Sequence, residues 1–151
     1  MDPLSSRMVR ASLLWLLAGV AIGAAMLVDR ALPGQWRAWL APSHAHMLFV
    51  GWFLQFALGV AYWLMPRRRS PERPLGYHER AASVAVIALN LGLVLRVIAE
   101  PLERSGQTTE LTLTTLAASA LLQLGAVLVF VIQMWPRLGA RQVRGRERPA
   151  A

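Results

Sequence analysis

The chain contains 151 residues, 56% of them hydrophobic and only 16% charged, and its formal net charge is +8. A soluble domain of this length needs more polar surface, so the composition favours a membrane protein. The sequence has no nucleophile–base constellation, phosphate loop or paired carboxylates, so a soluble hydrolase or transferase is not expected. All basic residues are arginines that cluster between apolar runs, so the expected partner is a lipid bilayer and not nucleic acid. Cysteine is absent, which excludes disulfides and thiolate ligands.

Four apolar runs, each about long enough to cross a bilayer as a helix, follow one another along the chain. They predict an all-α, integral membrane four-helix bundle that covers residues 11–136. A short polar head precedes the bundle at residues 1–10, and an arginine-rich tail follows at residues 137–151. The predicted spans are residues 11–28, 44–65, 81–99 and 111–135.

Local signals set the predicted ends of these spans. Ser43 is the expected N-cap of the second span, and Thr108 or Thr109 that of the fourth, which Pro136 should end. Residues 101–106 are expected to form a turn. These signals describe a simple up-and-down order of helices.

The first span carries Gly19 and Gly23 four residues apart, a spacing that lets a second helix approach closely. The same segment also has the positive head, apolar run and small residues of a secretory signal peptide, which is the rival interpretation. Its apolar run is long for a signal peptide and three further spans follow, so we expect a retained helix.

The arginines also predict the orientation of the bundle. Twelve of them lie in the head, in the loop between the second and third spans, and in the tail, whereas the other two loops hold Arg30, Arg37 and Arg104. Cytoplasmic segments carry the excess of basic residues, so both termini should be cytoplasmic. The start of the second span and the end of the third then lie at the outer face.

Two histidines, His44 and His46, open the second span. At 100° per residue their side chains point about 200° apart, so they should face opposite sides of one helix. His46 should lie on a more hydrophobic face of the helix. His44 should face the bundle interior, where a glycine such as Gly51 leaves room for a flat macrocycle. The residues expected on the His44 face are Leu48, Gly51, Gln55, Gly59 and Tyr62.

The chemistry of imidazole leaves the ligand open. Imidazole binds haem iron, copper and zinc alike, and Met47 would add a soft ligand for copper(I). An ionisable side chain near a bilayer core indicates a functional site. The competing interpretation is that His44 and His46 are ordinary interfacial residues that bond to water or lipid, because two histidines one residue apart are a weak signal.

Arg96, near the outer end of the third span, is the second unusual group. It either extends to the interface like other arginines at helix ends or binds an anion, such as a haem propionate, at the depth of the histidines. His78 lies at the opposite end of the bundle and is expected to be a solvated loop residue. Three mid-membrane amides, Gln55, Asn90 and Gln123, should join helices by hydrogen bonds.

The stretch Ser-His-Ala-His-Met-Leu-Phe at residues 43–49, with Gly51-Trp52, Ala61-Tyr62-Trp63 and Pro66-Arg67 after it, resembles the ligand helices of haem–copper oxidase subunit I. It is especially similar to the early histidine helix of the nitric oxide reductase large subunit. It also resembles the NnrS-like family of haem- and copper-containing membrane proteins, in which a later helix closes on Leu-Arg-Val, here residues 95–97. A final Pro136-Arg137 fits that family too.

This resemblance implies haem b, with copper as the alternative, in the inner membrane of a prokaryote. The ligand would be His44 or His46, with Arg96 as the matching arginine. Four spans with one histidine-bearing helix cannot form a complete oxidase. We therefore expect electron transfer or handling of nitric oxide or oxygen, in a homo-oligomer, a trimer or dimer, or a larger redox complex. The rival functions are a cofactor-free scaffold or assembly subunit and a small transporter with a path along its buried amides.

Overall fold

The computed structural model describes residues 1–28, 35–66, 70–71 and 73–138, and this part of the chain is helical without any β-strand. Its second span is one continuous rod in which a π-helix, η2, separates two α-helices. The elements are α1 (Pro3–Val28), α2 (Trp36–His46), η2 (Met47–Leu54), α3 (Gln55–Leu64), α4 (Glu79–Arg104) and α5 (Glu110–Leu138).

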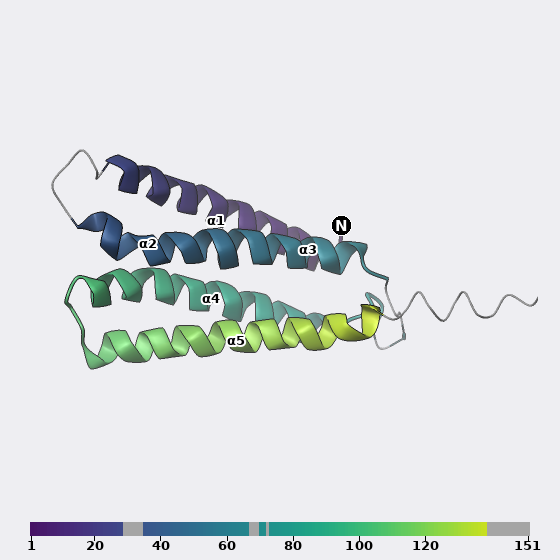
Figure 1. The fold of residues 1–151 in the computed structure, drawn as a ribbon. Coiled ribbons are helices and arrows are strands. Elements are labelled where there is room, and N and C mark those ends of the chain that lie inside the picture. The colour runs from purple at the N-terminus through teal and green to yellow at the C-terminus, as the bar shows by residue number, and fades with distance from the viewer. Residues whose placement is uncertain (29–34, 67–69, 72, 139–151) are drawn as a thin grey trace, which may run out of the picture.

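The helices run up and down as two hairpins that lie side by side (Figure 1). In the first, α1 packs along the rod formed by α2, η2 and α3; in the second, α4 packs along α5. The two hairpins meet where α2 and η2 contact α4. We call the end that holds the start of α2 and the α4–α5 turn the histidine end, and the end that holds the start of α1 and the end of α5 the tyrosine end.

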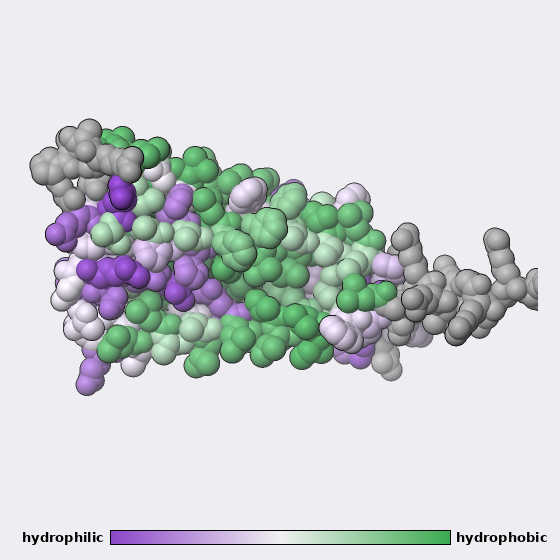
Figure 2. All heavy atoms as spheres, in the orientation of Figure 1, coloured by the Kyte–Doolittle hydropathy of each residue, from purple (hydrophilic) through white to green (hydrophobic). Residues whose placement is uncertain are grey.

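As predicted, four helices among the described residues are long and apolar enough to cross a membrane. The second span and α5 have 29 residues each, and α1 and α4 have 26, all of them apolar enough to cross a membrane. At 1.5 Å per residue these helices are about 39 to 43 Å long, close to the thickness of a bilayer with its headgroups. Apolar side chains cover the middle of the visible face (Figure 2), as expected of a surface that contacts lipid.

The first helix begins eight residues earlier than predicted, at Pro3. Asp2 caps it: its Oδ1 accepts the Ser5 backbone N–H at 2.9 Å and the Tyr77 hydroxyl at 3.1 Å. Proline suits the first helical position because its missing N–H has no intrahelical partner there. Residues 3–10, predicted as a polar head, are therefore helical.

Most of the other span ends also differ from the prediction, because the second span begins earlier and α4 and α5 run further than expected. Ser43 is not an N-cap: it is buried within α2, which begins at Trp36. Pro101 and Pro136 lie inside α4 and α5 and do not stop them. The expected cap at Thr109 is confirmed, since its hydroxyl accepts the Thr112 backbone N–H at 3.2 Å.

The tyrosine end is closed by a buried cation that the sequence placed in the tail. Arg137, only 1% exposed, donates to the carbonyl oxygens of Tyr62, Met65 and Pro66 at 3.0, 2.7 and 3.1 Å. These carbonyls lie in the last turn of α3 or directly after it, where a helix end leaves such groups without intrahelical donors. Arg137 thus ties the end of α5 to the end of the second span. Residues 139–151 lie outside the described part of the chain.

Close packing in the first hairpin depends on glycines from both of its sides. A Cβ added at Gly19 would lie 2.7 Å from a Leu48 side-chain atom, and one added at Gly59 would lie 3.0 Å from Met8 Cβ. The close approach of another helix predicted for Gly19 and Gly23 therefore occurs within the chain, against its own second span. These faces are not available to a second subunit.

The orientation of the bundle across the membrane stays a prediction with a direct test. The turn at Ser105 and the loop at Ser70 lie at opposite ends of the bundle. The chain has no cysteine, so single cysteines report without background. We expect Ser105→Cys to react with a membrane-impermeant thiol reagent in intact cells, and Ser70→Cys to react only after lysis. The reverse pattern would place both termini outside.

Candidate functional site at the histidine end

His44 points from α2 toward α1. Its Nδ1 lies 2.8 Å from the Gly19 carbonyl oxygen, and its ring lies over Gly23, where an added Cβ would be 2.8 Å from the ring carbon Cε1. A larger side chain at position 23 would thus displace the imidazole. The inward orientation predicted for His44 is correct in the sense that its ring lies between two helices of the bundle.

His44 also lines a groove of about 670 Å³ between the end of α1 and the start of α2. The walls of this groove are almost entirely apolar, and its polar side chains are His44 and Arg37. The groove residues are Val20, Gly23, Ala24, Met26, Leu27, Arg37, Ala41 and His44. The sequence did not connect Arg37 with this histidine, because Arg37 was predicted to lie in a loop and His44 at the start of the second span; the structure places both in α2.

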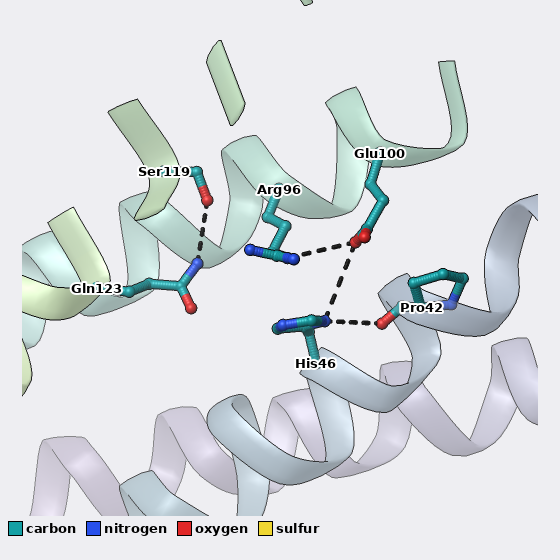
Figure 3. A network of polar contacts seen from close by, with 6 residues as sticks. All are labelled: Pro42, His46, Arg96, Glu100, Ser119 and Gln123. Carbon is teal, nitrogen blue, oxygen red and sulfur yellow. Dashed lines mark hydrogen bonds and ion pairs between the residues drawn. The ribbon is translucent and has the colours of Figure 1, made fainter. Parts of the chain in front are cut away.

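His46 points the other way, toward α4. Its Nδ1 lies 2.9 Å from the Pro42 carbonyl oxygen and 3.9 Å from Glu100 Oε2. Arg96 Nε donates to the same carboxylate oxygen at 3.3 Å. Figure 3 shows the three side chains converging, with the Arg96 guanidinium between Glu100 and the amide of Gln123. The divergence predicted for the two histidines is thus observed.

The hydrogen bonds of the two imidazoles indicate their tautomer. A backbone carbonyl can only accept, so Nδ1 of His44 and of His46 must carry the proton. In the neutral ring Nε2 then keeps its lone pair, and neither Nε2 has a hydrogen-bond partner within the described ranges. Metal-binding histidines are commonly oriented in this way, by a carbonyl on the far nitrogen.

Glu100 is the residue that sequence analysis missed. Its exposed fraction is 8%, and it joins Arg96 and His46 into one network. The spacing of four between Arg96 and Glu100 was a visible signal, since such pairs share a helix face. Glu100 lies just beyond the predicted end of the third span, where a carboxylate is expected to be solvated. For that reason it was not expected to belong to the site.

Two other expected site residues lie elsewhere. The space beside Gly51 holds the Trp15 ring and a Leu93 methyl group, so this glycine permits helix packing where a macrocycle was expected. Met47 is buried against Gly19, on the α1 side, and therefore accompanies His44 and not His46. Within the described residues no three His, Cys, Asp or Glu side chains gather closely enough to hold a metal ion.

The buried amides play three different roles. Asn90 joins two helices as predicted, since its Oδ1 accepts the Trp15 indole N–H at 2.8 Å. Gln123 instead bonds within α5, where its Nε2 donates to Ser119 Oγ at 3.0 Å. Gln55 is fully buried, and neither atom of its amide has a partner among the described residues. The prediction of cross-helix bonding is therefore wrong for Gln55 and Gln123.

Taken together, four long apolar helices and a polar cluster at one end of the bundle define the class of this molecule: it is a helical, multi-pass membrane protein. Comparison takes the identification no further, since no protein family, no curated protein and no solved structure matches the chain. Any narrower function therefore depends on the residues of the histidine end.

Proposed function

We propose that this protein binds haem b, or copper in its place, at the histidine end and acts in electron transfer or in the handling of nitric oxide or oxygen. The observation that supports this most is the orientation of His44: its Nδ1–H is held by the Gly19 carbonyl, which leaves the Nε2 lone pair for a metal. A bound haem iron would supply a one-electron redox change and a coordination position for a small gas.

The groove between α1 and α2 supports His44 over His46 as the ligand. Its volume of about 670 Å³ and its apolar walls suit a large, flat and mostly apolar group. Arg37 lines the same groove and would offer a cation to a propionate. Arg96, the arginine expected for that role, lies on the other side of the second span, facing α4 beside Glu100. Met26 also lines the groove and would favour copper(I) as the alternative metal.

The competing function is a scaffold or assembly subunit without a cofactor. One observation favours it: the bond from His44 to Gly19 crosses between two helices, so the histidine already has a structural role. In that case the role of His44 would be to hold α1 against α2 in the first hairpin. The two functions differ in colour and in metal content.

The test is the absorption spectrum and metal content of the detergent-purified protein, compared among three histidine variants. We expect a Soret band or stoichiometric copper in the unaltered protein. His44→Ala should abolish it, because the axial ligand is lost. His78→Ala is the matched control: His78 is exposed at the tyrosine end, and its replacement should change nothing.

His46→Ala completes the comparison, since its Nε2 also has no hydrogen-bond partner in the described part of the chain. Loss of the cofactor in this variant and not in His44→Ala would move the site to the side of α4. A colourless, metal-free protein, or full cofactor content in the double variant His44→Ala/His46→Ala, would exclude the proposed function. Circular dichroism of each variant shows whether the bundle remains helical.

A further inference from the structure

A polar surface on the side of the bundle keeps hydrogen-bonding atoms that no other described residue contacts. It consists of His46, Arg96 and Gln123, and we call it the lateral polar surface. The side chains of His46 and Arg96 are 30% and 26% exposed, and Gln123 is partly buried. In Figure 2 hydrophilic surface extends inward from the histidine end over α2, α4 and α5. Exposed Phe49 and Phe53 lie further along the second span.

Part of this surface lies deeper along the helices than a headgroup layer extends. Arg96 is eight residues from the end of α4 and Gln123 is thirteen from the start of α5, which places them about 12 and 20 Å along their helices. The headgroup layer occupies only about 5 to 8 Å at each side of a bilayer. Lipid headgroups at the histidine end therefore cannot reach Gln123.

Each side chain of the lateral polar surface also keeps an unused hydrogen-bonding atom. Arg96 bonds through Nε alone, which leaves both terminal amino groups without an acceptor among the described residues. Neither His46 Nε2 nor Gln123 Oε1 accepts a hydrogen bond from any residue that the structure describes. Donors and acceptors are thus present on one surface. In lipid such unpaired groups are costly and favour association through hydrogen bonds.

We propose that the lateral polar surface binds a second copy of this chain, in a two-fold dimer whose axis runs along the membrane normal. Arg96 and His46 both contact Glu100, so they lie at the same depth. A two-fold rotation about the normal therefore brings Arg96 of each copy level with His46 of the other. The Arg96 amino groups then donate to His46 Nε2, twice, as an isologous interface requires.

Charge explains why a second copy suits this surface better than an anionic lipid. Glu100 neutralises Arg96, so the cluster offers hydrogen bonds and little net attraction for an anion. The glycine faces that could have packed against another subunit are already used between α1 and the second span. Exposed Phe49 and Phe53 would extend the contact with apolar area. The dimer does not depend on the proposed cofactor, because His44 lies on the other side of the second span.

The first test measures the oligomeric state by native mass spectrometry in mild detergent and by energy transfer in diluted proteoliposomes. The unaltered protein should be a dimer. Arg96→Leu should weaken the dimer about tenfold or more, because two interhelical hydrogen bonds are lost. Arg104→Leu removes an exposed arginine from the same helix and is the matched control. A monomeric unaltered protein, or equal dissociation constants for the two variants, would refute the proposal.

A second measurement holds even where Arg96→Leu folds poorly. Phe49→Cys, with the rest of the chain unchanged and free of cysteine, should form a disulfide with its own copy, since an isologous contact places this side of the second span against itself. Leu17→Cys, equally exposed on α1, should remain monomeric under the same oxidation. Two outcomes would assign the lateral polar surface to another occupant. One is cross-linking of Leu17→Cys without cross-linking of Phe49→Cys. The other is a membrane-soluble small molecule that stays bound to monomers only when Arg96 is present. Neither readout requires a bound cofactor.

Discussion

Replacing Gly51 by alanine should destabilise the bundle by about 1–3 kcal/mol, the usual cost of overpacking a filled core. The added Cβ would lie 2.6 Å from Trp15 Cγ, 2.8 Å from Trp15 Cβ and 2.7 Å from a Leu93 methyl carbon. The leucine methyl can rotate away. The tryptophan atoms are next to the α1 backbone, so they move only if the helix moves. That shift would also strain the Trp15–Asn90 hydrogen bond.

The matched control is Gly125→Ala in α5, because a Cβ at Gly125 would meet nothing within 4 Å. An exposed helical glycine costs about 0.5–1 kcal/mol relative to alanine, so this variant should be slightly more stable than the parent. Unfolding in mixed micelles, followed by circular dichroism against the fraction of SDS, measures both. Equal stability of the two variants would show that α1 is not held against η2 as described.

The second large effect is expected for Arg137→Leu. The substitution leaves the carbonyl oxygens of Tyr62, Met65 and Pro66 without their buried cationic donor. Hydrogen bonds to charged groups contribute about 1.5–3 kcal/mol each, so a loss of about 3 kcal/mol or more is expected. The thermal midpoint Tm, followed by intrinsic tryptophan fluorescence, should fall clearly.

Arg104→Leu again supplies the control, since Arg104 is exposed in the last turn of α4 and should matter by less than about 1 kcal/mol. Arg137→Lys distinguishes charge from geometry. A single ammonium cannot reproduce the guanidinium fork that contacts three carbonyls, so this variant should fall between the parent and Arg137→Leu. A Tm for Arg137→Leu equal to that of Arg104→Leu would contradict the assigned role.

The spans were predictable because their signal is strong: each apolar run is about long enough to cross a bilayer as one helix, and arginines separate the runs. Their ends were less predictable. Ser43 and Pro101 carry the chemistry of helix boundaries, yet both lie within helices. In a bilayer the backbone must bond to itself, so a helix continues past such residues where a soluble one would stop.

The histidine end was predictable only in part. The geometry of a regular helix correctly predicted that the side chains of His44 and His46 point to different sides, because both residues belong to α2 and precede η2. The π-helix after them was invisible in an apolar run, and it winds more loosely than 100° per residue. Even so, the predicted face was right for Gly51, Gln55, Gly59 and Tyr62, all of which are buried. The roles of Glu100 and Arg37 were missed because both residues lie outside the predicted spans, whereas the structure places Glu100 within α4 and Arg37 within α2.

The Arg137 contacts also constrain the order in which the chain assembles. The carbonyls that it binds precede it by 71 to 75 residues. The first hairpin thus leaves the ribosome and enters the bilayer well before the donor for its open end has been made, because synthesis proceeds from the N-terminus. Insertion of α5 then completes a helix end formed two spans earlier.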